Sequence, residues 1–309
     1  MAMFSNRKVD SNYDFFSWFT YYVPGVGGMF GLLLWLLLGS LIGSLIAGMF
    51  MIFLGLSADS ELVMIISYPL MFIPAMMYAK FQSGRNAIFE PGVSIDSNHF
   101  GKLGGFLTAI CVMVATIGAG FMMDVVNSAM PPMPKWLEDA LGGLTGGNVI
   151  LNFICVSLFA PLFEEWLCRG EVLRGLLNCT RTTSDGTTVR GIKPVWAIVI
   201  SAAFFAVIHM NPWQAIPAFA LGLLFGYVYY KTGSIKLTML MHFTNNTVAL
   251  ICGQLSFFEE AETWFDVLPV PVYCVLFVAF GAFIWWFVKQ LDTIPMIDEQ
   301  GNCDRVEAE

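Results

Sequence analysis

Residues 30–54 read FGLLLWLLLGSLIGSLIAGMFMIFL, a run without a single charged side chain. A helix that crosses the hydrocarbon core of a bilayer needs roughly 20 apolar residues, about 30 Å at a rise of about 1.5 Å per residue. The strands of a membrane barrel would instead alternate apolar and polar residues, which this run does not do. The stretch therefore predicts a transmembrane helix.

Similar runs recur along the chain, whose residues are 57% hydrophobic and only 12% charged. One soluble core of 309 residues cannot enclose so much apolar surface. Pro69 and Pro74 interrupt one run and Pro212 separates two others, so the borders are soft and seven or nine spans also fit. We predict an all-α, polytopic membrane helix bundle of about eight transmembrane helices. The further runs cover about 62–79, 103–123, 149–173, 195–210, 213–230, 236–256 and 267–288.

The lysines and arginines predict the orientation, because short loops that carry basic residues are retained on the cytoplasmic side. With the N-terminus inside, Lys135 is the one basic loop residue outside. Both termini are therefore predicted to be cytoplasmic, and in a bacterium the membrane would be the inner membrane. The basic residues on the predicted cytoplasmic side are Arg7, Lys8, Lys80, Arg85, Lys102, Arg174, Arg181, Arg190, Lys193, Lys231, Lys236, Lys289 and Arg305.

Three segments follow from this pattern. Residues 1–27 are polar and aromatic rather than apolar, which predicts a segment in the membrane interface and no cleavable signal peptide. Residues 28–290 form one membrane domain, because its loops are too short to fold alone. Residues 291–309 form an acidic tail. The net charge of −8 leaves no basic surface for nucleic acid, so that class of partner is excluded.

Small residues and cysteines both indicate helix packing. Gly39, Gly43 and Gly48 give the first span a surface that another helix can approach closely. The seven cysteines show no paired or metal-like spacing, so a disulfide framework is not expected.

The fourth span contains ionisable residues, in the sequence APLFEEWLCRGE at 160–171. A charge at the centre of a bilayer costs roughly 2.5–3.5 kcal/mol or more, so each one needs a reason. Glu165 and Arg169 are four residues apart, which places them on one helical face where they can neutralise each other. Glu164 points about 100° away and is left to act as a proton acceptor. The alternative is that both glutamates only join a structural ion-pair network.

Two of the three histidines also lie in predicted spans, whereas His99 lies in a polar loop. His209 ends an apolar stretch one turn after Phe205, and His242 precedes Asn246 by one turn on the same face. A lone membrane histidine more often bonds a neighbouring helix than takes part in chemistry. If these faces meet the glutamates, a carboxylate and one imidazole can hold a water while another imidazole and an amide stabilise an oxyanion. Peptide-bond hydrolysis requires these groups.

At these residues the sequence resembles the family of CAAX proteases and bacteriocin-processing enzymes, the CPBP or Abi family, which is related to the type II CAAX prenyl endopeptidases. The resemblance covers about 150–250, where the patterns EExxxR, FxxxH and HxxxN occur in that order on successive predicted spans. They stand here as Glu164, Glu165 and Arg169, as Phe205 and His209, and as His242 and Asn246.

The resemblance implies an intramembrane endopeptidase. Glu164 with His209 would activate the water, and His242 with Asn246 would stabilise the oxyanion. The implied partners are the lipid bilayer and a peptide or protein substrate at the membrane, prenylated or otherwise membrane-associated. The supporting residues would be Glu165, Arg169 and Phe205.

The metal requirement stays open at this point. Glu164, His209 and His242 are also a set that can bind Zn²⁺ with a water in the fourth position. We favour no cofactor, because there is no local HExxH pair and Arg169 would repel a divalent cation. Counting residues along upright helices places His242 about 9 Å deep and His209 beyond about 18 Å, a mismatch that only tilted or displaced helices would remove.

Two other classes of protein fit the same residues. In a proton- or ion-coupled transporter, the intramembrane Glu, His and Arg would line a pathway, but the expected corresponding sites in two halves of the chain are missing. A non-catalytic membrane scaffold or immunity protein would keep these residues for packing alone.

Overall fold

The computed structural model describes residues 16–55, 61–89, 92–138, 148–182, 184–186, 188–255, 261 and 263–295. Almost all of the regular structure in these ranges is helical, with one antiparallel pair of short strands. The elements are η1 (Ser17–Phe19), α1 (Val26–Leu54), α2 (Glu61–Asn86), η2 (Gly101–Leu103), α3 (Gly104–Ser128), α5 (Val149–Asn152), η3 (Phe153–Phe159), α6 (Ala160–Glu165), η4 (Trp166–Leu173), α7 (Arg174–Leu177), β1 (Thr180–Thr182), β2 (Thr188–Arg190), α8 (Pro194–Val207), α9 (Pro212–Thr232), α10 (Ile235–Cys252), α11 (Trp264–Val267) and α12 (Val270–Asp292).

Five helical stretches of the described chain are long and apolar enough to cross a membrane, which indicates a multi-pass integral membrane protein. Helices occupy all eight predicted stretches, but α8 is short and α9 and α10 do not reach the same hydropathy. Polar residues such as His242 and Asn246 lower the hydropathy of α10. The all-α prediction is confirmed, whereas the count of eight spans stays a prediction. The five stretches are Val26–Leu54, Leu62–Asn86, Gly101–Ser128, Val149–Leu177 and Val270–Asp292.

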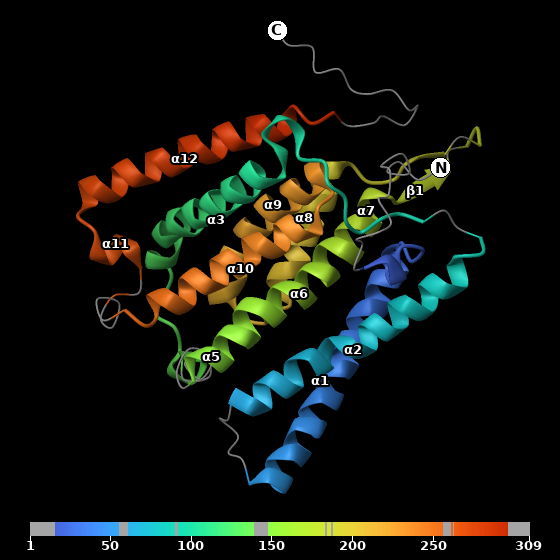
Figure 1. The fold of residues 1–309 in the computed structure, drawn as a ribbon, viewed down its shortest axis with the longest axis horizontal. Helices are drawn as coiled ribbons and strands as arrows, with labels where there is room; N and C mark the ends of the chain where they lie inside the picture. Colours follow the sequence, from blue (N-terminus) through green and yellow to red (C-terminus); the bar gives the residue numbers. More distant parts are fainter. Residues whose placement is uncertain are drawn as a thin grey trace.

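The helices form successive layers (Figure 1). The α1–α2 hairpin lies along one side, the continuous helix from α5 to α7 comes next, and α8, α9 and α10 follow. α3 packs on α9 and α10, and α12 covers α3 on the opposite side from the hairpin. The helix that bears the two glutamates therefore lies between the hairpin and the rest of the bundle.

Small residues bring α1 and α2 together, as the sequence predicted. A Cβ atom added at Gly39 would lie 2.1 Å from the backbone oxygen of Met71, and one at Gly43 would lie 3.0 Å from that of Ser67. A Cβ atom added at Gly48 would have no neighbouring atom within 4 Å. Only two of the three predicted glycines therefore permit the close approach of the helices.

The N-terminal aromatic segment packs onto the bundle. Phe16, Phe19 and Tyr22 are buried in the core, and the Phe19 ring lies 5.2 Å from that of Trp166. Trp18 is 65% exposed and faces outward. The described part of the predicted interfacial segment is thus amphipathic, with one face held by the protein; residues 1–15 lie outside the described residues.

Arg174 joins this segment to the end of the glutamate-bearing helix. Its buried guanidinium donates hydrogen bonds to the carbonyl oxygens of Val93 (2.6 Å), Tyr22 (2.5 Å) and Gly170 (2.6 Å). Glu171 lies 3.2 Å away and balances the charge. One side chain thereby fixes three chain segments.

Candidate active site

The glutamates lie on a helix that contains two π-helical segments. Val149–Leu177 is continuous, but η3 and η4 are π-helical and flank the short α-helical segment α6. Pro161 near the start of α6 has no N–H to donate and its ring crowds the carbonyl four residues earlier, which favours a wider turn there. π-helical turns are rare and are frequent at functional sites.

Glu165 and Arg169 form the ion pair that their spacing predicted. Arg169 Nη1 lies 2.7 Å from Glu165 Oε1, and both side chains are 0% exposed. Arg169 Nη2 also donates to the carbonyl oxygen of Gly222 on α9, at 3.1 Å. The guanidinium carbon lies 4.5 Å from the centre of the Phe205 ring on α8. The pair is thus enclosed by helices that are distant in sequence.

His242 on α10 joins this pair. Its Nδ1 lies 3.0 Å from Glu165 Oε1, and the residue is 4% exposed. Because an ion-paired carboxylate accepts a hydrogen bond, the natural tautomer has the proton on Nδ1 and a lone pair on Nε2. Nε2 lies 4.0 Å from Glu164 Oε2. His242 therefore lies between the two glutamates.

Glu164 takes a second neighbour from α2. The hydroxyl of Tyr68 donates a short hydrogen bond to Glu164 Oε1. Glu164 Oε2, the oxygen that faces His242, is buried and accepts no hydrogen bond from the described residues. This oxygen is the atom available to a third group in the site.

Phe205 brings the two histidines near each other. The rings of His209 and His242 are both edge-on to Phe205, with ring centres at 5.1 Å and 5.4 Å. His209 lies just beyond the end of α8, with Nδ1 2.8 Å from the Phe205 carbonyl oxygen. Both imidazoles thus contact the same ring despite the depth mismatch expected from upright helices. No hydrogen bond or ion pair in the described chain joins His209 to Glu164.

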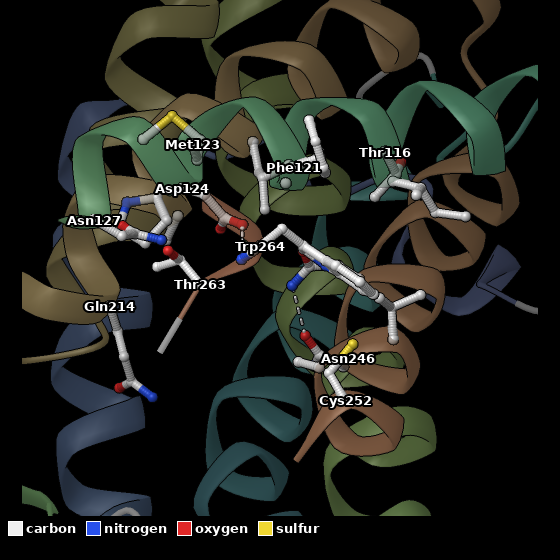
Figure 2. Close-up of a pocket in the computed structure, with 18 of the residues that line it drawn as sticks. Thr116, Phe121, Met123, Asp124, Asn127, Gln214, Asn246, Cys252, Thr263 and Trp264 are labelled. Atoms are coloured by element: carbon white, nitrogen blue, oxygen red, sulfur yellow. Dashed lines mark hydrogen bonds between the residues drawn. The ribbon is translucent and has the colours of Figure 1, made fainter. Parts of the chain in front are cut away.

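Asn246 lies one turn beyond His242. Its amide nitrogen donates to the carbonyl oxygen of Val156, at 2.8 Å, within π-helical η3. Its amide oxygen accepts from Asn245 at 3.1 Å, the contact drawn beside Asn246 in Figure 2. The glutamate-bearing helix is thus joined to α10 at two places, through Val156 in η3 and through Glu165 in α6.

The zinc set predicted as an alternative does not converge. Among the described residues, no group of three or more His, Cys, Asp and Glu side chains is arranged to hold a metal ion. We derive no step that involves a metal.

A cavity of about 880 Å³ opens beside these residues, between α3, α9, α10 and α12. Figure 2 shows Asn127 of α3, Gln214 of α9 and Asn246 of α10 around this space. Four of the seven predicted site residues line it, namely Phe205, His209, His242 and Asn246. The buried Glu165–Arg169 pair lies behind this wall and fixes His242 within it.

Comparison with protein families matches residues 146–248 to the model described as type II CAAX prenyl endopeptidase Rce1-like. This segment is a domain of that family. The family resemblance inferred from the sequence motifs is confirmed. A search of curated proteins found no match, and neither did a search of solved structures.

The family domain contains all seven predicted site residues, but Tyr68 lies outside it. Sequence reasoning missed Tyr68, because a tyrosine in an apolar run has many packing roles and its partner is 96 residues away. The available signal was a hydroxyl within the second predicted span, where a polar group needs a hydrogen-bond partner, but Ser67 and Tyr78 in the same span give the same signal.

Proposed function

We propose that this protein is an intramembrane endopeptidase that hydrolyses a peptide bond with a water activated by Glu164. Membership of the CAAX endopeptidase family supports a protease with a protein or peptide substrate. The observation that carries the proposal is His242 between the two glutamates, at 3.0 Å from Glu165 and 4.0 Å from Glu164.

The 4.0 Å between His242 Nε2 and Glu164 Oε2 is too long for a direct hydrogen bond. One water oxygen at ordinary hydrogen-bond distances from both atoms fits that separation. Tyr68 holds the other oxygen of Glu164 and so orients the carboxylate. The Glu165–Arg169 pair orients His242 through Nδ1. Glu164 and His242 are thus each held in place by a neighbouring side chain.

In the proposed reaction, Glu164 accepts a proton as the water oxygen attacks the carbonyl carbon of the substrate. The carbonyl oxygen becomes an oxyanion, and Asn246 in the cavity wall acts as a hydrogen-bond donor to it, together with His209 when this imidazole carries a proton on both ring nitrogens. The proton then passes from Glu164 to the departing amine nitrogen as the C–N bond breaks. The products are a carboxylic acid and an amine, and Glu164 is again a carboxylate.

This assignment exchanges the two histidines relative to the roles that the family resemblance implied. His242, rather than His209, is the neighbour of Glu164. His209 lines the cavity with its Nδ1 already bonded to a backbone oxygen, which leaves Nε2 for the substrate.

The test compares cells that produce the intact protein with cells that produce Glu164→Gln at equal membrane levels. Mass spectrometry of new chain ends should detect fragments whose formation falls by about 10²–10⁴-fold in the variant, the usual contribution of a general base. Glu138→Gln removes an exposed carboxylate outside the site and is the matched control, with unchanged fragments expected. Identical fragments from intact protein and Glu164→Gln would favour the scaffold or transporter hypotheses.

A further inference from the structure

The cavity occupies only one half of the bundle. The lining residues from α3 lie within 116–127, those from α9 within 213–225 and those from α10 and its end within 242–253, and further lining residues come from η3, α8, α11 and α12. α3 and α10 contribute their second halves and α9 its first half. Since α9 runs opposite to α10, these halves lie at the same end of the bundle, where α8 turns into α9.

The other half of the bundle is filled with side chains. Val112, Val228, Met241 and Phe287 are each no more than 1% exposed and form one core cluster between α3, α9, α10 and α12. This cluster lies between the cavity and the turn between α9 and α10 at Gly233. A substrate that avoids this cluster would reach His242 from the opposite end, termed the open end, where α8 turns into α9.

The charges of the described residues differ between the two ends. Lys135 is the one lysine or arginine near the open end, where Asp124, Glu138 and Asp266 also lie. Short basic loops stay in the cytoplasm, so the closed end is the cytoplasmic one. The basic residues at helix ends on the closed side are Lys80, Arg85, Lys102, Arg174, Lys193, Lys231, Lys236 and Lys289.

We propose that the site receives its substrate from the extracytoplasmic side of the membrane. The substrate class is an extended peptide segment at that surface, such as the outer juxtamembrane part of a membrane protein or a peptide delivered from outside. This inference rests on the proposed function for the cleavage itself, and on the cavity and the charges for the direction of entry.

Polar groups at the open end suit a peptide backbone. Asn127 Oδ1 lines this end, is buried, and has no hydrogen-bond partner among the described residues. It is available to accept from a substrate N–H group. Figure 2 shows Asn127, Asp124 and Gln214 on the walls of this end. The carboxylate of Asp124 already accepts from the backbone of Trp264, which fixes the segment that borders the opening.

The chain has a native thiol at each end to test the direction. Cys252 lines the cavity at its open end, whereas Cys179 follows α7 at the closed end. Two variants each keep one of these cysteines, with the others replaced by serine. A membrane-impermeant maleimide should label Cys252 in intact cells and Cys179 only after permeabilisation. The reverse pattern would overturn the inference.

Two further variants repeat the comparison in a chain without other cysteines. Gln214→Cys places one thiol in the cavity wall, and Lys102→Cys, in a separate variant, places one at an exposed position of the closed end.

The cut sites found by comparison with Glu164→Gln test the substrate itself. Cuts in extracytoplasmic segments are expected, and cuts confined to cytoplasmic segments would refute this inference but leave the proposed protease. If no fragment depends on Glu164, the protease proposal fails while the labelling still reports the direction of the opening.

Discussion

Replacing Arg169 with methionine removes the charge that balances Glu165 while keeping a side chain of similar length. Both members of the pair are 0% exposed, so Glu165 would be left as a buried carboxylate without its cation. Breaking a buried pair in this way costs about 3–5 kcal/mol. The guanidinium carbon of Arg169 lies 4.5 Å from the centre of the Phe205 ring, and losing this cation–π contact also lowers the stability. We therefore expect Arg169→Met to lower the free energy of unfolding by about 3–5 kcal/mol.

The double variant Glu165→Gln/Arg169→Met separates the stranded charge from the lost packing. A neutral glutamine keeps an oxygen for His242 Nδ1, which now lies 3.0 Å from Glu165 Oε1. The cation–π contacts and the hydrogen bond from Arg169 to the Gly222 carbonyl oxygen are then missing, but no buried carboxylate is left without its cation. The double variant should be more stable than the single one.

The measurement is unfolding of the purified protein in micelles by a denaturing detergent, followed by tryptophan fluorescence. Lys289→Met, which removes an exposed cation at the end of α12, is the control and should stay near the wild type. A loss below about 1 kcal/mol for Arg169→Met would mean that the pair behaves like a solvated surface pair. That result would refute the description of a closed, buried support for His242.

Two further variants test other contacts. Tyr68→Phe removes a hydrogen bond to a charged group, Glu164, so the free energy of unfolding should fall by about 1.5–3 kcal/mol. Fragment formation should also fall at equal membrane level, because the carboxylate loses the group that orients it; unchanged cleavage would show that Tyr68 does not orient the carboxylate. Gly39→Ala places a Cβ atom 2.1 Å from the Met71 carbonyl oxygen and should lower unfolding stability by about 1–3 kcal/mol, whereas Gly48→Ala, with open space around it, should be neutral or slightly stabilising in the same detergent titration.

Much of the fold class could be predicted from the sequence, because the thickness of the bilayer sets the length of the apolar run that a spanning helix needs. Long apolar runs mark helices irrespective of their neighbours, and helices occupy all eight predicted stretches. Apolar runs do not say which helices face lipid. α8 has only 14 residues, and α10 contains polar residues such as His242, so neither has the length and apolarity of the five long stretches. The number of spans therefore could not be decided by counting runs.

Within the site, the sequence alone determined what lies within one helix. The Glu165–Arg169 pair follows from a spacing of four residues, because 3.6 residues per turn place such side chains on one face. The order of the three motifs was likewise enough to identify the family domain.

Only the tertiary structure decided which helices meet and through which atoms. It placed Tyr68 on Glu164, His242 between both glutamates, and the cavity in one half of the bundle. These contacts depend on the tilt of each helix and on its rotation, which the π-helical segments η3 and η4 alter. Residue spacing determines neighbours along a helix, whereas packing against other helices determines neighbours across the bundle.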